Sequence, residues 1–333
     1  MKGKIASAAK YVIGLAVAIS LLYYVFRGWD LNDLLIRFKQ VNYYWVLLSV
    51  FLSIISHALR AYRWNILLEP VGYTSLSTYR TFKAVMIGYL TNLAAPRLGE
   101  ITRCGVLKRT DNVNMSASIG TVVAERIFDF LGLLSLILLA LLLEFDRLST
   151  FFTDFINDKF SSINITSVQL TIILIIGFIV VVGLGSLWWL KEKIKKKPFY
   201  FKLRSFIKEM MAGFTSVLRL QKKGRFWLST IFIWGLYYIM AYVLFFSIES
   251  TSHLGLTAGL SILIMGGLGM SAPVQGGFGA YHLFVGSVLL TYGIAEKDGY
   301  FFATLVHTSQ TLAVMFFGGI SLLLTLPKKK NKQ

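Results

Sequence analysis

Long, nearly uninterrupted runs of apolar residues recur along the chain and predict helices that cross a membrane. About 20 apolar residues in helical conformation cover the ~30 Å hydrocarbon core of a bilayer. Surface helices of soluble proteins instead have one apolar and one polar face, so continuous runs favour a lipid environment. The runs with the required length cover residues 5–26, 43–66, 118–143, 168–190, 226–248 and 302–326.

Two further apolar segments, 84–109 and 254–293, are interrupted, and each contains a proline. Proline removes a helical hydrogen bond, and glycine permits unusual backbone dihedrals. Each segment is therefore predicted to form a helical hairpin. The two turns share the pattern Ala-Pro-x-x-Gly, and the breaks are expected at Pro96, Gly99, Pro273 and Gly279.

Basic residues orient the predicted spans, because cytoplasmic loops of membrane proteins are enriched in Lys and Arg. Segment 191–225 carries 12 basic and 2 acidic residues, a net charge of +10, and is expected in the cytoplasm. Segment 144–167 carries four acidic and two basic residues and is expected outside. Lysines near both ends of the chain then place both termini in the cytoplasm.

The same count gives the two hairpins opposite orientations. Basic residues flank 84–109 on both sides, so this hairpin is expected to enter and leave from the cytoplasm, whereas 254–293 enters from outside. Broken helices of opposite orientation are typical of inverted-repeat transporters. We therefore predict a single polytopic all-α domain over 1–333, with six full spans and an inverted repeat of two halves, 5–143 and 168–326.

The basic loop 191–225 contains a predicted amphipathic helix. Between residues 199 and 218 apolar side chains recur at spacings of three and four, with basic residues mostly on the opposite face. Such a helix lies in the membrane interface or packs on the cytoplasmic surface of the protein itself.

Composition excludes a water-soluble enzyme. Hydrophobic residues make up 56% of the 333 residues and charged residues 15%, and the mean hydropathy is +0.65. The net charge of +18 would suggest nucleic acid in a soluble protein, but here it follows the topology and favours anionic lipid headgroups, with no nucleic acid as partner. With Cys104 as its one cysteine, the chain has no disulfide framework or multi-cysteine metal site, and no metal or cofactor is expected.

Ionisable residues inside apolar segments are costly and mark candidate functional positions. Arg60 and Arg63 lie near the end of the second run, where they either snorkel to the interface or grip a lipid phosphate. Arg97, Glu100 and Arg103 lie at and after the break of the first hairpin. We expect Arg97 to bind the headgroup, with Arg60 and Arg103 beside it, and Glu100 to orient an arginine or to take part in coupling.

The third full run begins with Glu125, Arg126 and Asp129, of which the two acids are four residues apart and share a helix face. They are expected either to neutralise the hairpin arginines or to form part of a proton or ion path.

The second hairpin carries further polar candidates. The backbone N–H groups of Gly276 and Gly277 are expected to contact a phosphate, or the glycines simply permit close helix packing. His282 and His307, with Gln310 one turn later, form a polar cluster or act as structural hydrogen-bonding residues. His282 is included among the candidate coupling residues.

The motifs of several enzyme classes are absent from the sequence. The chain has no Gly-x-Ser-x-Gly elbow, no His-Glu-x-x-His zinc helix and no Gly-x-x-x-x-Gly-Lys-Ser/Thr phosphate loop. We therefore expect the protein not to be an enzyme.

Four strings in order resemble one known family. They are Arg-Ala-Tyr-Arg-Trp at 60–64, Asn-Leu-Ala-Ala-Pro-Arg-Leu-Gly-Glu at 92–100, Glu-Arg-x-x-Asp at 125–129 and Ala-Pro-Val-Gln-Gly-Gly-Phe-Gly at 272–279. Together they resemble the lysylphosphatidylglycerol synthase transmembrane region, the flippase-like membrane domain, from about residue 5 to 326.

The resemblance implies a polytopic protein of the prokaryotic inner membrane that moves a lipid. The last run is followed by only a few residues, so the synthase domain is expected to be absent and aminoacyl-lipid synthesis is not carried over. The family often has a glutamate where this chain has His282. A coupling role that depends on a carboxylate at this position is therefore not carried over.

The expected function is transbilayer movement of an anionic phospholipid or a polyprenyl-phosphate-linked lipid. The alternative is a non-catalytic accessory protein that holds a cell-envelope biosynthesis enzyme at the membrane through the basic loop. A third possibility is an intramembrane enzyme acting on lipid headgroups, which would need a nucleophile and base that the sequence does not display.

Overall fold

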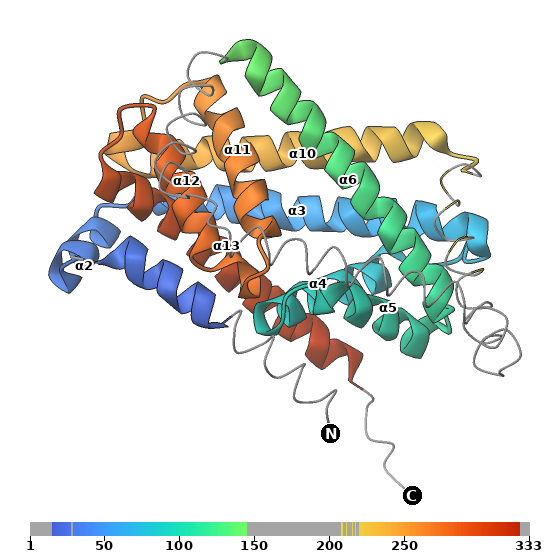
Figure 1. Cartoon of the computed structure of the whole chain (residues 1–333). Helices are drawn as coiled ribbons and strands as arrows, with labels where there is room; N and C mark the ends of the chain where they lie inside the picture. Colours follow the sequence, from blue (N-terminus) through green and yellow to red (C-terminus); the bar gives the residue numbers. More distant parts are fainter. Residues whose placement is uncertain are drawn as a thin grey trace, which may run out of the picture.

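The described part of the protein is a bundle of helices without strands (Figure 1). The structure is a computed structural model and describes residues 15–27, 29–144, 208, 211, 215, 217 and 220–326. The predicted span 168–190 and most of the basic loop, including its amphipathic helix, lie outside the described residues. For the predicted span 5–26, the described portion is helical over Leu15–Phe26.

Four helices are long and apolar enough to cross a membrane, and each coincides with a predicted span. Their lengths of 21 to 30 residues correspond to about 30–45 Å of helix. The fold class expected from the hydrophobic pattern is confirmed: this is an all-α membrane protein. The helices are α3 (Tyr43–Leu68), α6 (Met115–Leu143), α10 (Lys223–Val243) and α13 (Glu296–Thr325).

Helices α3 and α10 lie side by side along their lengths (Figure 1). The buried serines Ser49, Ser53 and Ser56 recur on one face of α3. Ser49 donates a hydrogen bond to the Met240 carbonyl of α10, at 3.2 Å. Small residues on a membrane helix let the backbones approach closely, which is why these two helices pack so extensively.

The first hairpin consists of α4 (Thr78–Ala94) and α5 (Leu98–Asp111), with its turn at Ala95–Arg97. Asn92 accepts a hydrogen bond from the Gly99 backbone N–H at 2.7 Å, which ties the start of α5 back to α4. A Cβ atom on Gly99 would overlap the Gly88 carbonyl, so the two helices pack backbone to backbone here. The interruption between α4 and α5 includes Pro96, whereas Gly99, the other expected break, lies in the first turn of α5.

The second hairpin consists of α11 (Leu256–Ser271), η5 (Gln275–Gly277) and α12 (Ala280–Leu290). Its turn follows Pro273 and places Gly276, Gly277 and Gly279 at positive φ values of 54°, 75° and 78°. Residues with a side chain rarely adopt this conformation, which explains the glycines. Pro273 and Gly279 both lie between the end of α11 and the start of α12.

The tips of the two hairpins meet inside the bundle. Helix α4 contacts η5, and a Cβ atom on Gly276 would lie 3.0 Å from a methyl group of Leu93, one residue before the end of α4. The helices of the hairpins have 11 to 17 residues, about 16–26 Å, so each is shorter than the hydrocarbon core. The sequence did not indicate that the two turns touch.

The remaining described helices are short. Helix α2 (Leu31–Lys39) follows the N-cap Asp30, and its Arg37 forms an ion pair with Asp298 in the first turn of α13. This contact joins segments 261 residues apart in sequence. The single-turn helices are η1 (Glu69–Val71), η3 (Leu244–Ser247) and η4 (Glu249–Thr251).

Candidate functional site

Ionisable side chains from three helices converge at one place, which we call the arginine cluster. Two come from α3, one from α5 of the first hairpin and three from α6. About 12 Å of helix separates Arg60 from Leu68, where α3 ends, so the cluster lies well inside this span. The members of the arginine cluster are Arg60, Arg63, Arg103, Glu125, Arg126 and Asp129.

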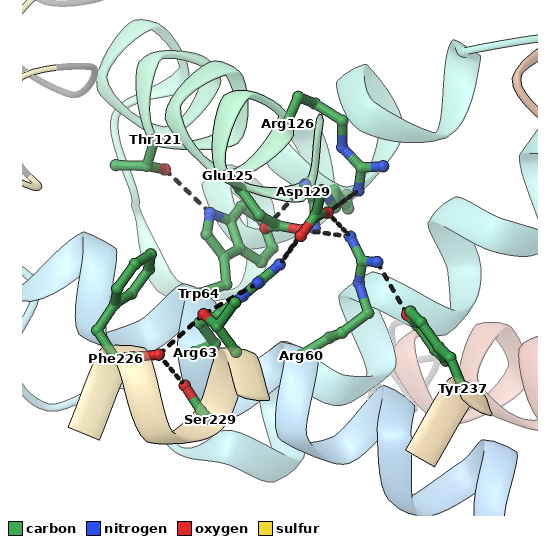
Figure 2. A network of polar contacts seen from close by, with 12 residues as sticks. Arg60, Arg63, Trp64, Thr121, Glu125, Arg126, Asp129, Phe226, Ser229 and Tyr237 are labelled. Carbon is green, nitrogen blue, oxygen red and sulfur yellow. Dashed lines mark hydrogen bonds and ion pairs between the residues drawn. The ribbon is translucent and has the colours of Figure 1, made fainter. Parts of the chain in front are cut away.

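Glu125 is the centre of the cluster and is fully buried. Arg60 donates a hydrogen bond to Glu125 Oε1 (Figure 2). Nη2 of Arg103 lies 3.2 Å from Glu125 Oε2, and Nη2 of Arg126 lies 3.2 Å from Oε1. Nη2 of Arg63 is 3.6 Å from Oε1. Four guanidinium groups therefore surround one carboxylate.

Asp129, one helical turn after Glu125, provides the second carboxylate. Its Oδ1 accepts a hydrogen bond from Arg63 at 2.5 Å, and its Oδ2 accepts one from Arg60 at 3.0 Å. Nη2 of Arg126 lies 3.9 Å from Oδ2. The spacing of four residues directs both acidic side chains toward α3, as the sequence predicted for a shared helix face.

Neutral side chains hold the arginines in position. Arg60 Nη1 donates to the Tyr237 hydroxyl of α10 at 3.0 Å. The Arg103 guanidinium carbon lies 4.4 Å from the centroid of the Trp64 ring, a cation–π contact. Trp64 Nε1 in turn donates to Thr121 Oγ1 of α6 at 2.9 Å, so the ring that supports Arg103 is itself fixed (Figure 2).

The cluster has more positive than negative charge. Four arginines and two carboxylates leave an excess of two positive charges among the described residues, because arginine stays protonated in proteins. Arg60, Arg63 and Arg103 are 6%, 0% and 4% exposed. The Nε atoms of these three arginines are buried without a hydrogen-bond partner. Buried, unbalanced positive charge with free donors favours the binding of an anion.

A small pocket opens beside the cluster, between the first hairpin and α6. Its polar lining comes from Asn92 and Tyr89 of α4, Glu100 and Arg103 of α5, and Arg126 of α6. Its volume of about 10 Å³ admits a single water molecule. An anion larger than water therefore enters only if the hairpin and α6 separate.

Of the residues singled out from the sequence, the structure brings Arg60, Arg103, Glu125, Arg126 and Asp129 together. The two acids contact arginines, including Arg103 of the first hairpin, as expected for charge partners.

Arg97 and Glu100 do not join this set of contacts. Arg97 is exposed at the N-cap of α5, in the left-handed conformation at φ 61°, and has no hydrogen bond or ion pair to any described residue. Glu100 lines the pocket, and its Oε2 is buried without a hydrogen-bond partner. The binding role expected of Arg97 and the orienting or coupling role expected of Glu100 stay predictions.

The residues singled out at the second hairpin form a separate group. His282 is buried in the first turn of α12, and Gly276 and Gly277 lie at the turn. This group belongs to the second hairpin, whereas the arginine cluster includes Arg103 of the first hairpin.

Sequence reasoning missed the contribution of α10. Tyr237 and Thr230 supply a hydroxyl to Arg60 and Arg63, respectively, the latter at 3.3 Å. They are seven residues apart, two helical turns, and therefore lie on one face of α10. Their spacing inside the apolar run 226–248 is the sequence feature that could have indicated a polar face on this helix.

Comparison with known proteins agrees with these features. The family model of the lysylphosphatidylglycerol synthase TM region matches residues 11–318. A UPF0104 membrane protein of Methanocaldococcus jannaschii is 30% identical over 95 residues, which are 28% of this chain and 38% of that relative. No solved structure matches the chain. Because the family model spans both hairpins and the whole arginine cluster, the chain belongs to the family of the lysylphosphatidylglycerol synthase transmembrane region.

Proposed function

We propose that the arginine cluster binds the phosphate of an anionic lipid and that the protein is a transporter, not an enzyme, which carries this lipid across the prokaryotic inner membrane. The excess of positive charge, with three buried arginines and the more exposed Arg126 around two carboxylates, supports this proposal most directly. Guanidinium groups bind phosphate oxygens through two parallel N–H···O bonds, so arginine suits a phosphate better than lysine does. Phospholipids and polyprenyl-phosphate-linked lipids both present such a phosphate.

The surface next to the cluster supports a lipid rather than a free anion. Arg126, at the pocket, has a side chain 44% exposed. Beyond it, α6 presents apolar side chains that no described residue covers: Phe130, Leu134 and Leu138 are 64%, 40% and 55% exposed. A headgroup at Arg126 would leave its acyl chains along this apolar face of α6.

The hairpins supply a route for the movement. Under the orientation predicted from basic residues, with both termini in the cytoplasm, the first hairpin enters from the cytoplasm and the second from outside. Their tips meet at Leu93 and Gly276. Opening the first hairpin away from α6 would expose the cluster to one leaflet, and a rearrangement at the joined tips would expose it to the other.

The accessory alternative depends on the basic loop 191–225. Most of that loop lies outside the described residues, so an envelope-biosynthesis enzyme as partner stays a prediction. The lipid assay below separates the two roles, because a purely accessory protein moves no lipid when it is alone in a vesicle.

The experiment measures headgroup accessibility of labelled anionic and zwitterionic lipids in proteoliposomes. We compare the native protein with Arg126→Gln and with Arg109→Gln, a control at an exposed arginine near the end of α5. Arg126→Gln is expected to slow exchange of the anionic lipid about tenfold or more, because a hydrogen bond to a charged group contributes ~1.5–3 kcal/mol. Arg97→Ala in the same assay tests the role expected of the hairpin tip.

Two results would contradict the proposal. One is an Arg126→Gln protein that exchanges anionic lipid at the native rate. The other is a folded native protein that exchanges no lipid, which would favour the accessory role.

A further inference from the structure

A second buried polar site lies at the tip of the second hairpin, apart from the arginine cluster. His282 of α12 and His307 of α13 are 2% and 4% exposed, and their ring centroids are 4.9 Å apart. Helices α12 and α13 pack side by side (Figure 1), and each contributes one of the two rings, whose planes are tilted by 58°.

Each of the two rings has one buried nitrogen atom without a hydrogen-bond partner among the described residues. His307 Nε2 lies 2.8 Å from the Gly276 carbonyl oxygen, and because a carbonyl only accepts, Nε2 carries the hydrogen and donates. In a neutral ring, the other nitrogen, Nδ1, then has a free lone pair. Nδ1 of His307 and Nδ1 of His282 are both buried without a hydrogen-bond partner.

Aromatic side chains surround the pair in the described part of the chain. Three rings contact it: Phe26, 6.3 Å from His282, and Phe278 and Tyr281, 4.7 Å and 5.3 Å from His307. Tyr281 is the titratable group that faces the pair from α12. Among the described residues, no carboxylate or cation from the neighbouring helices acts on either ring.

We propose that His282 and His307 together bind one exchangeable proton and that this proton couples lipid movement to a proton gradient. A proton from water on one side forms an N–H bond on one imidazole, which donates it to the free nitrogen of the other. Such a charge-assisted hydrogen bond is stronger than a neutral one and spreads the charge over two rings. A second proton is opposed by the like charge of the first. Return of the proton to water on the other side restores the neutral pair.

The contacts of the pair connect it to the first hairpin. His307 donates a hydrogen bond to the Gly276 carbonyl, and Gly276 packs against Leu93 near the end of α4. Helix α4 contacts α5 at Gly88 and Gly99, one turn before Arg103 of the arginine cluster. Protonation that turns the His307 ring toward His282 would weaken or break the hydrogen bond between His307 and the Gly276 carbonyl. Because Gly276 packs against Leu93, this would change the contact between the two hairpin tips.

The proton site is tested directly by NMR of the full chain in lipid nanodiscs with ¹⁵N-labelled histidine. The chain has four histidines, and His253, exposed in a loop, provides the matched control. The native pair is expected to take up one proton in total between about pH 8 and pH 4. His282→Gln and His307→Gln are each expected to leave the remaining ring neutral over that range, whereas His253→Gln leaves the pair unchanged. A native pair that stays neutral, or two rings that each take up a proton independently, would overturn the inference.

The coupling rests on the proposed function and is tested separately, with a pH gradient across proteoliposomes. The native protein is expected to change its rate of anionic-lipid exchange severalfold with the gradient, and His282→Gln to exchange at one rate with or without it. Gradient dependence that survives in both histidine variants overturns the coupling while lipid movement stands. A shared proton in a protein that moves no lipid keeps the proton site but removes both the lipid transport and its coupling.

Discussion

Arg60 of α3 and Glu125 of α6 form a buried ion pair, with side chains 7% and 0% exposed. The two residues are 65 positions apart in sequence. Their contact fixes the position of α6 against α3 and gathers the other arginines around one carboxylate. The pair thus has a structural role, while the excess charge around it is available to a ligand.

Removing the central carboxylate should destabilise the bundle. Glu125→Gln leaves Arg60, Arg63 and Arg126 with Asp129 as their one acidic partner among the described residues. Arg103, whose ion pair is with Glu125, loses its acidic partner. Breaking a buried pair by removing one partner costs about 3–5 kcal/mol. We expect a clearly lower unfolding temperature in detergent. Glu249→Gln, at an exposed acid in η4, is the control and should unfold as the native protein does.

The close packing of the first hairpin should not tolerate a methyl group at its crossing point. In Gly99→Ala the new Cβ overlaps the Gly88 carbonyl and Asn92, which forces α4 and α5 apart at a cost of about 1–3 kcal/mol. Gly105 lies in the same helix with open space around it, so Gly105→Ala should be neutral or stabilising. Thermal unfolding of both variants checks this; equal unfolding temperatures would contradict the packing.

The tip of the second hairpin should be sensitive to contact with the helix Leu15–Phe26. Gly279 and Gly293 both have a positive φ, 78° and 79°, so alanine strains the backbone at both positions. A Cβ at Gly279 would overlap Leu21, whereas none of the atoms around Gly293 lies within 4 Å. Gly279→Ala should therefore lower the unfolding temperature more than Gly293→Ala does. The reverse order would place the helix Leu15–Phe26 away from the tip.

The Tyr237 hydroxyl should stabilise the arginine cluster but should not be required for lipid exchange. Tyr237→Phe keeps the ring but removes the acceptor for Arg60 Nη1, which costs about 1–2 kcal/mol in a buried setting. We expect a small loss of stability, measured by thermal unfolding, and anionic-lipid exchange that persists. Complete loss of exchange in a folded variant would mean that the hydroxyl itself contacts the lipid.

The positions of Arg97 and Arg103 relative to the arginine cluster could not be predicted from the sequence. Both belong to the first hairpin and both were candidates, with Arg97 expected to be central. The turn leaves Arg97 exposed as the N-cap of α5, while Arg103, six residues later, faces Glu125. A turn residue points in a direction set by its own dihedrals, and that direction follows from the folded backbone, not from residue type.

Spans and breaks were predictable from local properties. Hydrophobicity adds up along a run such as 118–143, and proline disrupts the interior of a helix, so both features depend on neighbouring residues. The partners of Glu125, the touching of Leu93 and Gly276, and the pairing of His282 with His307 were decided by the packing of helices. Apart from the contact of Glu125 with its neighbour Arg126, these contacts join residues 22 to 183 positions apart. Their geometry depends on crossing angles and close approaches that only the assembled bundle defines.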